Sequence, residues 1–348
     1  MKEEPELRVG LLLDFFRGTR TGNEGSVQLL QPLAKDAQIR FFHHPDMRGL
    51  LLNMLPERVN EIIGLQHMKF FIFDDSIILS GANLSDSYFT NRQDRYMLID
   101  NNALCLNETG QLIFQGESSL HPFTGNTSEF RKVMSNKLDQ IFADFKERIP
   151  IVGYSAEETF ICPFLQLGSF NVHQEVNLLT KLFGCQDSDT EITMSTGYFN
   201  LYDTYANLIL KKSKCPANGF YNGSGLSGYI PSLYVHNSYN FFRQASLASA
   251  APIQRKHEIT IAEYTRPKWT FHAKGIWIAS DGMAATVVGS SNYGKLSSFC
   301  EYQFMYRTFS RYRSVFRDLE VGALLVTKNE SLILQIAEEK KALMNTAR

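Results

Sequence analysis

Two short segments of the sequence carry a histidine and a lysine separated by one residue. His67 and Lys69 open the segment HMKFFIFDDSIILSGAN, and His272 and Lys274 open HAKGIWIASDGMAATVVGSSN. Residues two apart in a strand point to the same face, so each pair presents an imidazole beside an ammonium group. One such pair alone is typical of a strand end at the surface. Its repetition, with a turn and an asparagine after it, indicates a functional unit that is present twice.

The chemistry that this duplicated unit favours is transfer of a phosphate ester. Two lysines would neutralise the non-bridging oxygens of a phosphate, and the amides of Asn83 and Asn292 would donate hydrogen bonds to them. One neutral histidine can attack phosphorus, and the other, with an ordinary pKa of ~6.5, can carry protons near neutral pH. Covalent catalysis then divides one difficult exchange into two displacements. Because the protein supplies the cations, we expect no metal and no cofactor.

The elements that must position these groups follow a similar order in both halves of the chain. After each His-x-Lys pair come an apolar strand, a polar turn, a second strand and, further on, a strand and a helix. Helical spacing also predicts helices over 26–38, 129–149 and 201–212. We therefore predict a mixed α/β fold of two similar halves, 1–155 and 156–348. Each half would be a mixed sheet flanked by helices, and a pseudo-two-fold axis would relate the two.

Length and composition describe an ordinary globular protein of two domains. The chain has 348 residues, of which 44% are hydrophobic and 20% charged, and its formal net charge is -1. A net charge this small gives no bulk attraction to nucleic acid, so no nucleic-acid partner is expected. The five cysteines form no Cys-x-x-Cys pair, which is typical of a reduced intracellular protein without structural zinc. No apolar run reaches the ~18 residues that span a bilayer, so any membrane contact would be peripheral.

The two motifs resemble the paired signature of the phospholipase D superfamily, His-x-Lys-x4-Asp-x6-Gly. The second copy has Ala279 where the aspartate belongs, and Asp281 lies in its longer turn. In the superfamily that aspartate is mainly structural, so its loss does not argue against activity. The first copy matches the signature at every position, as His67, Lys69, Asp74 and Gly81.

Longer stretches resemble one family of this superfamily, the mitochondrial-type phosphatidylglycerophosphate synthases. They include LLDFFRGTR, FTNRQDRY, WTFHAKG and YRSVFRDLE, and they cover most of the chain in family order. The resemblance implies CDP-diacylglycerol and glycerol-3-phosphate as substrates, and phosphatidylglycerophosphate and CMP as products, in phosphatidylglycerol and cardiolipin biosynthesis. It also implies a peripheral place on the matrix side of the mitochondrial inner membrane, although the start of the chain, MKEEPELRVG, does not read as a targeting peptide.

The same resemblance assigns the two histidines. His67 is the expected nucleophile, which attacks the phosphatidyl phosphorus and expels CMP. His272 is the expected base, which activates the hydroxyl of glycerol-3-phosphate. The two roles could also be exchanged.

Each catalytic imidazole needs a carboxylate that fixes its tautomer. In the first half we expect this to be Asp94, which follows the first-copy asparagine by 11 residues. In the second half Glu320 follows the asparagine by 28 residues, and removing the 17 residues 295–311 restores the spacing of 11. We therefore predict an insertion at 295–311, with Glu320 as the counterpart of Asp94. Glu301 is the alternative.

Five arginines near these motifs are candidates for binding the second phosphate of a substrate. A single arginine is more often solvated, but a loop after a strand adds backbone N–H groups that bind anions. The candidates are Arg17 and Arg20 in RGTR, Arg92 and Arg95 in NRQDR, and Arg266 in EYTRPKW.

Two other functions remain open from the sequence. The first is a phospholipase D-type phosphodiesterase or nuclease, in which water replaces the acceptor alcohol. The second is an inactive form, because the family that the chain resembles normally has more chain before LLDFFRGTR. The sequence does not indicate an oligomeric state.

Overall fold

The computed structural model describes most of the chain. The described residues are 7–20, 25–46, 64–100, 125–148, 159–184, 189–197, 199–211, 213, 217–222, 238–247, 259–294 and 313–347. The predicted insertion at 295–311, with the alternative carboxylate Glu301, lies outside them. No helix among the described residues is long and apolar enough to cross a membrane.

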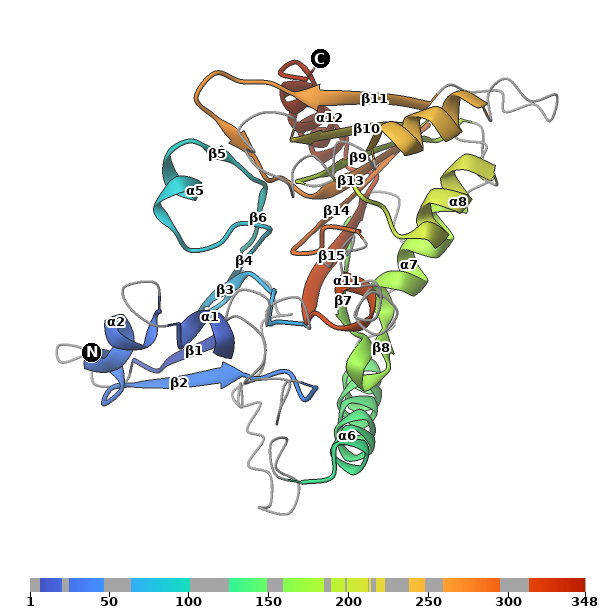
Figure 1. Cartoon of the computed structure of the whole chain (residues 1–348). Helices are drawn as coiled ribbons and strands as arrows, with labels where there is room; N and C mark the ends of the chain where they lie inside the picture. The colour runs from blue at the N-terminus through green and yellow to red at the C-terminus, as the bar shows by residue number, and fades with distance from the viewer. Residues whose placement is uncertain are drawn as a thin grey trace.

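The largest element is a mixed sheet of eight strands built from the second half of the chain (Figure 1). Three strands at one end run parallel to one another, and the others pair antiparallel. In spatial order the strands are β11 (Ile259–Tyr264), β10 (Ala217–Asn222), β9 (Glu191–Thr196), β13 (Gly275–Ser280), β14 (Met283–Gly289), β15 (Glu320–Thr327), β7 (Thr159–Leu167) and β8 (Val172–His173).

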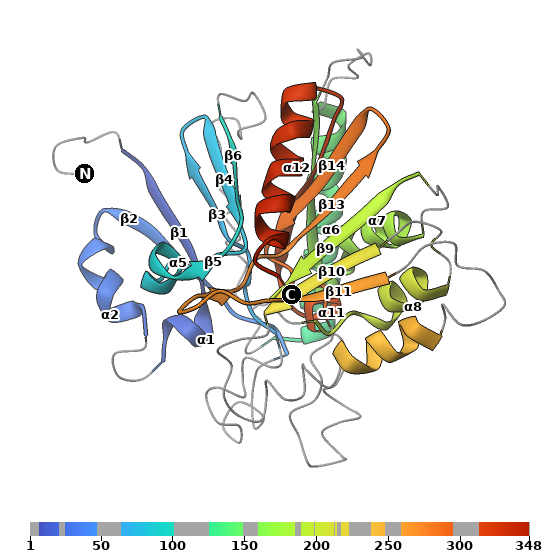
Figure 2. The same ribbon diagram turned by 90° about the horizontal axis from the view of Figure 1, so that it is seen from above.

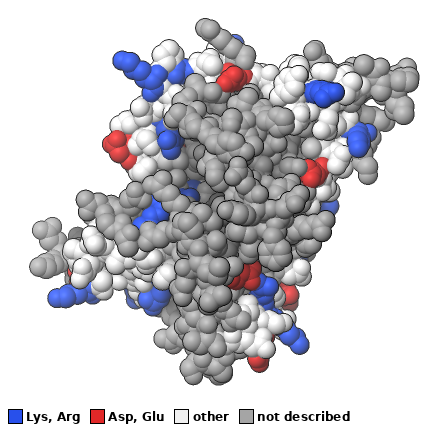
Figure 3. All heavy atoms as spheres, viewed as in Figure 1, with Lys and Arg blue, Asp and Glu red and all other residues white. Residues whose placement is uncertain are grey.

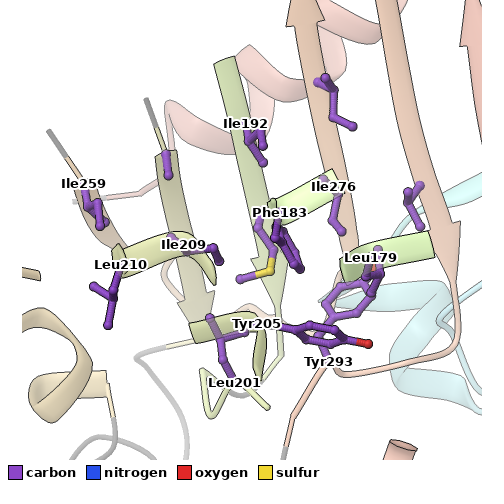
Figure 4. Close-up of a cluster of buried hydrophobic side chains, with 14 of the residues drawn as sticks. Leu179, Phe183, Ile192, Leu201, Tyr205, Ile209, Leu210, Ile259, Ile276 and Tyr293 are labelled. Atoms are coloured by element: carbon purple, nitrogen blue, oxygen red, sulfur yellow. The ribbon is translucent and has the colours of Figure 1, made fainter. Parts of the chain in front are cut away.

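Helices cover both faces of this sheet, so its central strands are buried on both sides and are almost wholly apolar. On one face, α7 (Gln174–Phe183) and α8 (Asp203–Lys211) pack on Ile276 and Ile278 of β13. Figure 4 shows part of this cluster. On the other face, Trp277 of the same strand belongs to a cluster with Leu343 of α12 (Glu330–Met344). Figure 2 shows these helices on opposite sides of the sheet.

The first half forms two smaller sheets among the described residues. β1 (Val9–Asp14) pairs in parallel with β2 (Ala37–Phe42), and the strands β3 (Phe70–Phe73), β4 (Ser76–Ser80) and β6 (Tyr96–Ile99) pair antiparallel. Strand β4 contacts β14 and β15 of the large sheet. The remaining short elements are α1 (Phe15–Gly18), α2 (Val27–Leu30), η2 (Gln31–Leu33), α5 (Asp86–Thr90), β5 (Arg92–Gln93), η4 (Gly168–Phe170), β12 (Thr270–Phe271) and α11 (Arg313–Phe316).

The mixed helix and strand class that the sequence predicts is confirmed, but one of its details differs. The helix predicted over 26–38 is limited to α2 and η2, because Pro32 starts a 3-10 turn and β2 begins at Ala37. The helix α6 (Thr127–Arg148) packs through Leu138 on Leu167 and Leu319 of the second half. The predicted boundary at 155 lies outside the described residues, so it stays a prediction, as does the pseudo-two-fold axis.

Charged side chains of both signs are interspersed among the described residues on the face shown in Figure 3.

Candidate active site

The first His-x-Lys motif is held in place by the backbone of the second half. Gln66 forms an isolated parallel bridge with Leu319. His67 N donates to Leu319 O over 2.9 Å, and Leu319 N donates to Leu65 O over 3.0 Å. This short pairing puts Glu320, the first residue of β15, beside His67.

The second His-x-Lys motif is held by the first half in the same manner. It follows β12, which pairs in parallel with β5. His272 N donates to Gln93 O over 2.8 Å. This pairing puts Asp94, the residue after β5, beside His272.

The two histidines and two carboxylates consequently pair crosswise between the halves. His67 Nδ1 lies 3.0 Å and 2.9 Å from the two carboxylate oxygens of Glu320, and His272 Nδ1 lies 2.8 Å from Asp94 Oδ2. Sequence reasoning predicted both carboxylates but placed each with the imidazole of its own half, which is wrong. A carboxylate at Nδ1 keeps the proton there and leaves the lone pair of the neutral ring on Nε2.

Both lysines of the motifs are buried within the same cluster. Lys69 Nζ donates to His67 O, and Lys274 Nζ donates to His272 O, each over 2.7 Å. Burial lowers the pKa of Lys69 well below its usual value, and burial lowers the pKa of Lys274 to about 8. The charge of Lys274 also lowers the pKa of Lys69, whereas Glu320 raises it. A phosphate anion placed between these lysines would stabilise their charged forms.

The ring of His272 has a second close neighbour besides the carboxylate of Asp94. Lys274 Nζ lies 2.6 Å from Nδ1 and 2.9 Å from Nε2, so the ammonium group lies across the ring. Burial and, next, the charge of Lys274 lower the pKa of His272 to about 3, while Asp94 opposes this shift. His272 is therefore neutral at physiological pH.

A close approach of the two halves is visible at Gly81. A side chain at this position would meet Lys274 Cδ at 2.8 Å and Asp94 Oδ1 at 2.9 Å. Glycine thus lets the turn after β4 lie directly against the lysine and carboxylate of the other half-site. The sequence marks this position as the final glycine of the first signature.

The two asparagines lie at the edge of the cluster, and both are half-buried. Asn83 Nδ2 donates to Tyr88 Oη over 3.1 Å, and Tyr88 Oη lies 3.2 Å from His272 Nδ1. Asn292 Oδ1 has no hydrogen-bond partner among the described residues. Sequence reasoning missed Tyr88, although its place five residues after the first asparagine was a usable signal.

Sequence reasoning also missed two serines, Ser80 at the end of β4 and Ser290 directly after β14. Ser290 Oγ donates to Glu320 Oε2 over 2.5 Å, and Ser80 Oγ donates to Arg95 O over 2.7 Å. Both serines are fully buried. They precede the asparagine in the repeated small-residue turns, SGAN and GSSN, where only the asparagine was taken as functional.

Asp74 does not belong to the catalytic cluster, so its inclusion among the catalytic residues is wrong. It is exposed in the turn between β3 and β4, with a φ of 49°. Aspartate tolerates this left-handed conformation better than most residues, which explains its place in a tight hairpin turn. In the second copy, Ala279 lies near the corresponding hairpin end and pairs with Ala284.

Arg95 is a structural residue, and its assignment to substrate binding is wrong. It is 3% exposed, and Nε and Nη2 bind the carboxylate of Glu339 at 2.8 Å and 2.6 Å. Nη1 and Nη2 also donate to Val287 O and Thr286 Oγ1, and the guanidinium group lies 4.0 Å from the centre of the Trp277 ring. With these donors engaged inside the protein, Arg95 joins α12 to the sheet.

The other four arginines lie nearer the surface. Arg17 is half-buried after β1, and its charge lowers the pKa of Lys69. Arg92 is half-buried over the ring of Tyr88, and its charge lowers the pKa of Lys274. Each of these two arginines therefore lies within electrostatic reach of one catalytic-site lysine. Arg20 is half-buried beyond α1, and Arg266 is exposed and stacks on Trp269 at 3.6 Å.

Among the residues that the structure describes, no group of three or more His, Cys, Asp or Glu side chains could hold a metal ion. The six groups that the structure does bring together are those expected for phosphoryl-group chemistry. They are His67, Lys69, Asp94, His272, Lys274 and Glu320.

Comparisons with known proteins agree with this site. No protein family model matches the chain. It is 32% identical to the mitochondrial CDP-diacylglycerol–glycerol-3-phosphate 3-phosphatidyltransferase of Gallus gallus, over 98% of this chain and 67% of that protein. The corresponding protein of Homo sapiens is also 32% identical, over 97% of this chain and 66% of the relative. The chain thus spans about two thirds of the length of these curated relatives.

A solved structure matches the fold over the whole chain. The phosphatidylserine synthase of Haemophilus influenzae Rd KW20 superposes with a TM-score of 0.62 at 17% identity, covering 100% of this chain and 76% of that one. The fold of the chain is therefore that of this synthase. By its sequence, the chain belongs to the CDP-diacylglycerol–glycerol-3-phosphate 3-phosphatidyltransferase family.

Proposed function

We propose that this chain transfers a phosphatidyl group from CDP-diacylglycerol to glycerol-3-phosphate, forming phosphatidylglycerophosphate and CMP. The relatives that match nearly the whole of this chain are named for this reaction. The observation that carries the proposal is the pair of buried imidazoles, each bound to a carboxylate of the other half and accompanied by a lysine. Such a site supplies a nucleophile, a base and two cations without any other group.

In the first step, His67 Nε2 attacks the phosphatidyl phosphorus. A P–N bond forms while the P–O bond to CMP breaks, and CMP leaves as a phosphate monoester that needs little protonation. Glu320 at Nδ1 stabilises the positive charge that develops on the ring. The two lysines neutralise the non-bridging oxygens in the transition state.

In the second step, His272 accepts the proton of the glycerol-3-phosphate hydroxyl, and that oxygen attacks phosphorus. The new P–O bond forms as the P–N bond breaks, which restores His67. A base must be neutral before it acts, and His272 is neutral because burial and Lys274 lower its pKa. A bound phosphate would offset the charge of Lys274 and so raise the basicity of His272 during the reaction.

The assignment of the nucleophile to His67 has a structural argument besides the resemblance. Lys274 Nζ lies within 2.9 Å of both ring nitrogens of His272. This ammonium group competes for the lone pair with which His272 would attack phosphorus. As the base, His272 needs its lone pair only in the second step, after the first displacement has changed the charge of the site.

The reaction can be tested with CDP-diacylglycerol labelled in the phosphatidyl group, in detergent, with and without glycerol-3-phosphate. We expect CMP release in quantity only when the acceptor is present, with the label in phosphatidylglycerophosphate. Label in phosphatidic acid at equal rates with and without the acceptor would instead identify a hydrolase. Absence of CMP under both conditions from a folded protein would identify an inactive form.

We further propose that the protein acts at the matrix side of the mitochondrial inner membrane as a peripheral protein. The vertebrate relatives are named mitochondrial, which supports the compartment. An apolar rim supports the membrane contact. It consists of Leu84 and Phe89, which are 75% and 69% exposed and flank the site residues Asn83 and Tyr88.

Cationic and aromatic side chains lie next to this rim. β5, which follows α5, pairs with β12, and Asn91 Nδ2 donates to Lys268 O over 3.3 Å. The exposed Arg266 stacks on Trp269 in the same segment. Figures 1 and 2 both show α5 and β5 beside the chain that leads into β12. Apolar, cationic and indole groups together suit the interface of an anionic bilayer.

Replacing both rim residues with glutamate, Leu84→Glu with Phe89→Glu, should weaken binding to vesicles of phosphatidylcholine and phosphatidylglycerol by about tenfold or more. The change removes apolar area and adds repulsion, and vesicle flotation measures it. The control is Leu334→Glu, at a position 63% exposed on α12. Equal loss in both variants, or none in either, would contradict a contact at the rim. Activity in detergent should stay near that of the wild type.

A further inference from the structure

A buried carboxyl group outside the two histidine pairs lies behind the second-copy turn. Glu175, the second residue of α7, is 1% exposed, and its Oε1 accepts a hydrogen bond from Ser291 Oγ over 2.8 Å. Its Oε2 has no hydrogen-bond partner among the described residues. None of the described cationic side chains forms an ion pair with it. Burying a carboxyl group without a cation costs folding free energy, so we looked to the contacts of Glu175 for a function that accounts for it.

The titratable groups that face Glu175 are neutral or acidic. They are Tyr205 of α8, Tyr293 of the turn and Glu320 of β15, whose pKa values Glu175 raises. Burial raises the pKa of Glu175 itself to about 7, and only the Ser291 hydrogen bond opposes this shift. The first turn of α7 also favours the charged form, but burial dominates. Glu175 is therefore a carboxyl group that gains its charge near neutral pH.

The hydrogen bond from Ser291 ties Glu175 to the turn 290–293, which connects directly to the site. Ser291 Oγ accepts from Tyr293 N over 3.2 Å, and Tyr293 adopts a φ of 54°. Thr196 Oγ1 donates to Asn292 O over 3.0 Å. At the start of the turn, Ser290 Oγ donates to Glu320 Oε2, the oxygen that lies 2.9 Å from His67 Nδ1. Glu175 therefore reaches His67 through Ser291, Ser290 and Glu320.

We propose that Glu175 is a positioning residue that fixes the turn 290–293, and thereby orients Glu320 toward His67 and Asn292 toward the phosphate. This inference rests on the proposed function, because the orientation matters only if His67 is the nucleophile. The role needs a hydrogen-bond acceptor at Oε1 and does not need a charge. A charge there works against the site, because it raises the pKa of Glu320 further.

Three variants separate these requirements. Glu175→Gln keeps an acceptor oxygen and cannot ionise, Glu175→Ala removes the acceptor, and Ser291→Ala removes the donor. Glu338→Ala, at an exposed position on α12, is the control. For each, kcat and KM for glycerol-3-phosphate-dependent CMP release would be measured between pH 6 and 9, with a thermal melt at each pH.

We expect Glu175→Gln to keep kcat near the wild-type value at pH 6 and to lose the fall in kcat that the wild type shows as Glu175 ionises above about pH 7. Glu175→Ala and Ser291→Ala should each lower kcat by about tenfold or more with little change in KM. The double variant should be no worse than Ser291→Ala, because both changes break the hydrogen bond between Ser291 and Glu175, and only Ser291→Ala also removes the acceptor of Tyr293 N. A folded Glu175→Ala with unchanged kcat, or additive losses in the double variant, would overturn the proposal.

The thermal melts distinguish a positioning role from a merely structural one. A protein with a carboxyl group whose pKa is raised in the folded state loses stability as the pH rises. For Glu175 this loss falls between the pKa of the unfolded state, 4.5, and that of the folded state, about 7. Glu175→Gln should therefore be at least as stable as the wild type at pH 8. If Glu175→Ala does not fold, Glu175→Gln and Ser291→Ala still decide the matter through their pH profiles and kcat.

Failure of the proposed function would be visible separately. If the wild type releases no CMP, the ¹⁵N NMR signals of the His67 imidazole report the positioning directly. The inference requires that Ser291→Ala shift the Nδ1 signal that senses Glu320, whereas Glu338→Ala leaves it unchanged. An unshifted signal in Ser291→Ala would overturn the inference whatever reaction the protein catalyses.

Discussion

His67→Ala is expected to abolish CMP release, with kcat/KM falling by at least about 10⁴-fold. The reason is that His67 supplies the atom that bonds to phosphorus, and Glu320 at Nδ1 fixes the tautomer in which Nε2 carries the lone pair. Rapid-quench measurement with labelled CDP-diacylglycerol should show no burst of CMP. The variant also removes a buried hydrogen bond to Glu320, so a thermal melt must accompany the rates.

His272→Ala is the informative comparison for this prediction. It leaves the first displacement possible, so a stoichiometric burst of CMP should persist while steady-state turnover falls by about 10²–10⁴-fold, the usual range for loss of a general base. The phosphatidyl group would then stay on the protein, and acid-labile label on the denatured chain would detect it. A burst in His67→Ala and none in His272→Ala would show that the two roles are exchanged.

Exchanging a carboxylate for its amide should impair the histidine of the other half. Glu320→Gln is expected to slow the CMP burst, because its partner is His67, and Asp94→Asn is expected to slow turnover after the burst, because its partner is His272. Each loss should be about 10²–10⁴-fold, since an amide at Nδ1 favours the wrong tautomer. Burst rate and steady-state rate, measured on the same samples, separate the two effects.

Two other acidic positions provide matched controls. Asp74→Asn should leave both rates unchanged, because Asp74 is exposed in a hairpin turn whose left-handed φ asparagine also tolerates. Glu301→Gln should likewise have no effect. Loss of activity in Glu301→Gln with an unaffected Glu320→Gln would contradict both the inserted segment and the role of Glu320. Equal effects of Glu320→Gln and Asp94→Asn on the burst would contradict the crosswise pairing.

The local part of the fold could be read from patterns along the chain. The hairpins β3–β4 and β13–β14 follow from apolar runs on either side of a polar turn, and the helices α6, α8 and α12 follow from helical spacing over short windows. The order of the eight strands could not be read, because sheet order depends on pairings between distant segments. The helix expected over 26–38 is wrong because a proline and a following strand outweighed its apolar spacing.

Arg95 and Tyr88 show the same limit of sequence-based prediction within the active site. Arg95 lies in the stretch FTNRQDRY and Tyr88 directly before it, yet residue type did not distinguish a substrate contact from a structural one. Arg95 points into the protein, where Glu339 of α12, 244 residues away, engages it. Tyr88 reaches His272, which is 184 residues away. Contacts at such separations leave no periodic signal in a single sequence.

The sequence by itself determined the chemical groups of this protein and their local geometry. A histidine and a lysine two residues apart in an extended segment share a face, and a glycine with small residues after the hairpin brings an asparagine close by. Only the tertiary structure decided which carboxylate serves which imidazole. The 65–67 segment pairs with Leu319 and β12 pairs with β5, so each histidine enters the other half beside its acid. Backbone pairing between distant segments is a property of the folded chain, because its hydrogen bonds form only after the two halves pack together.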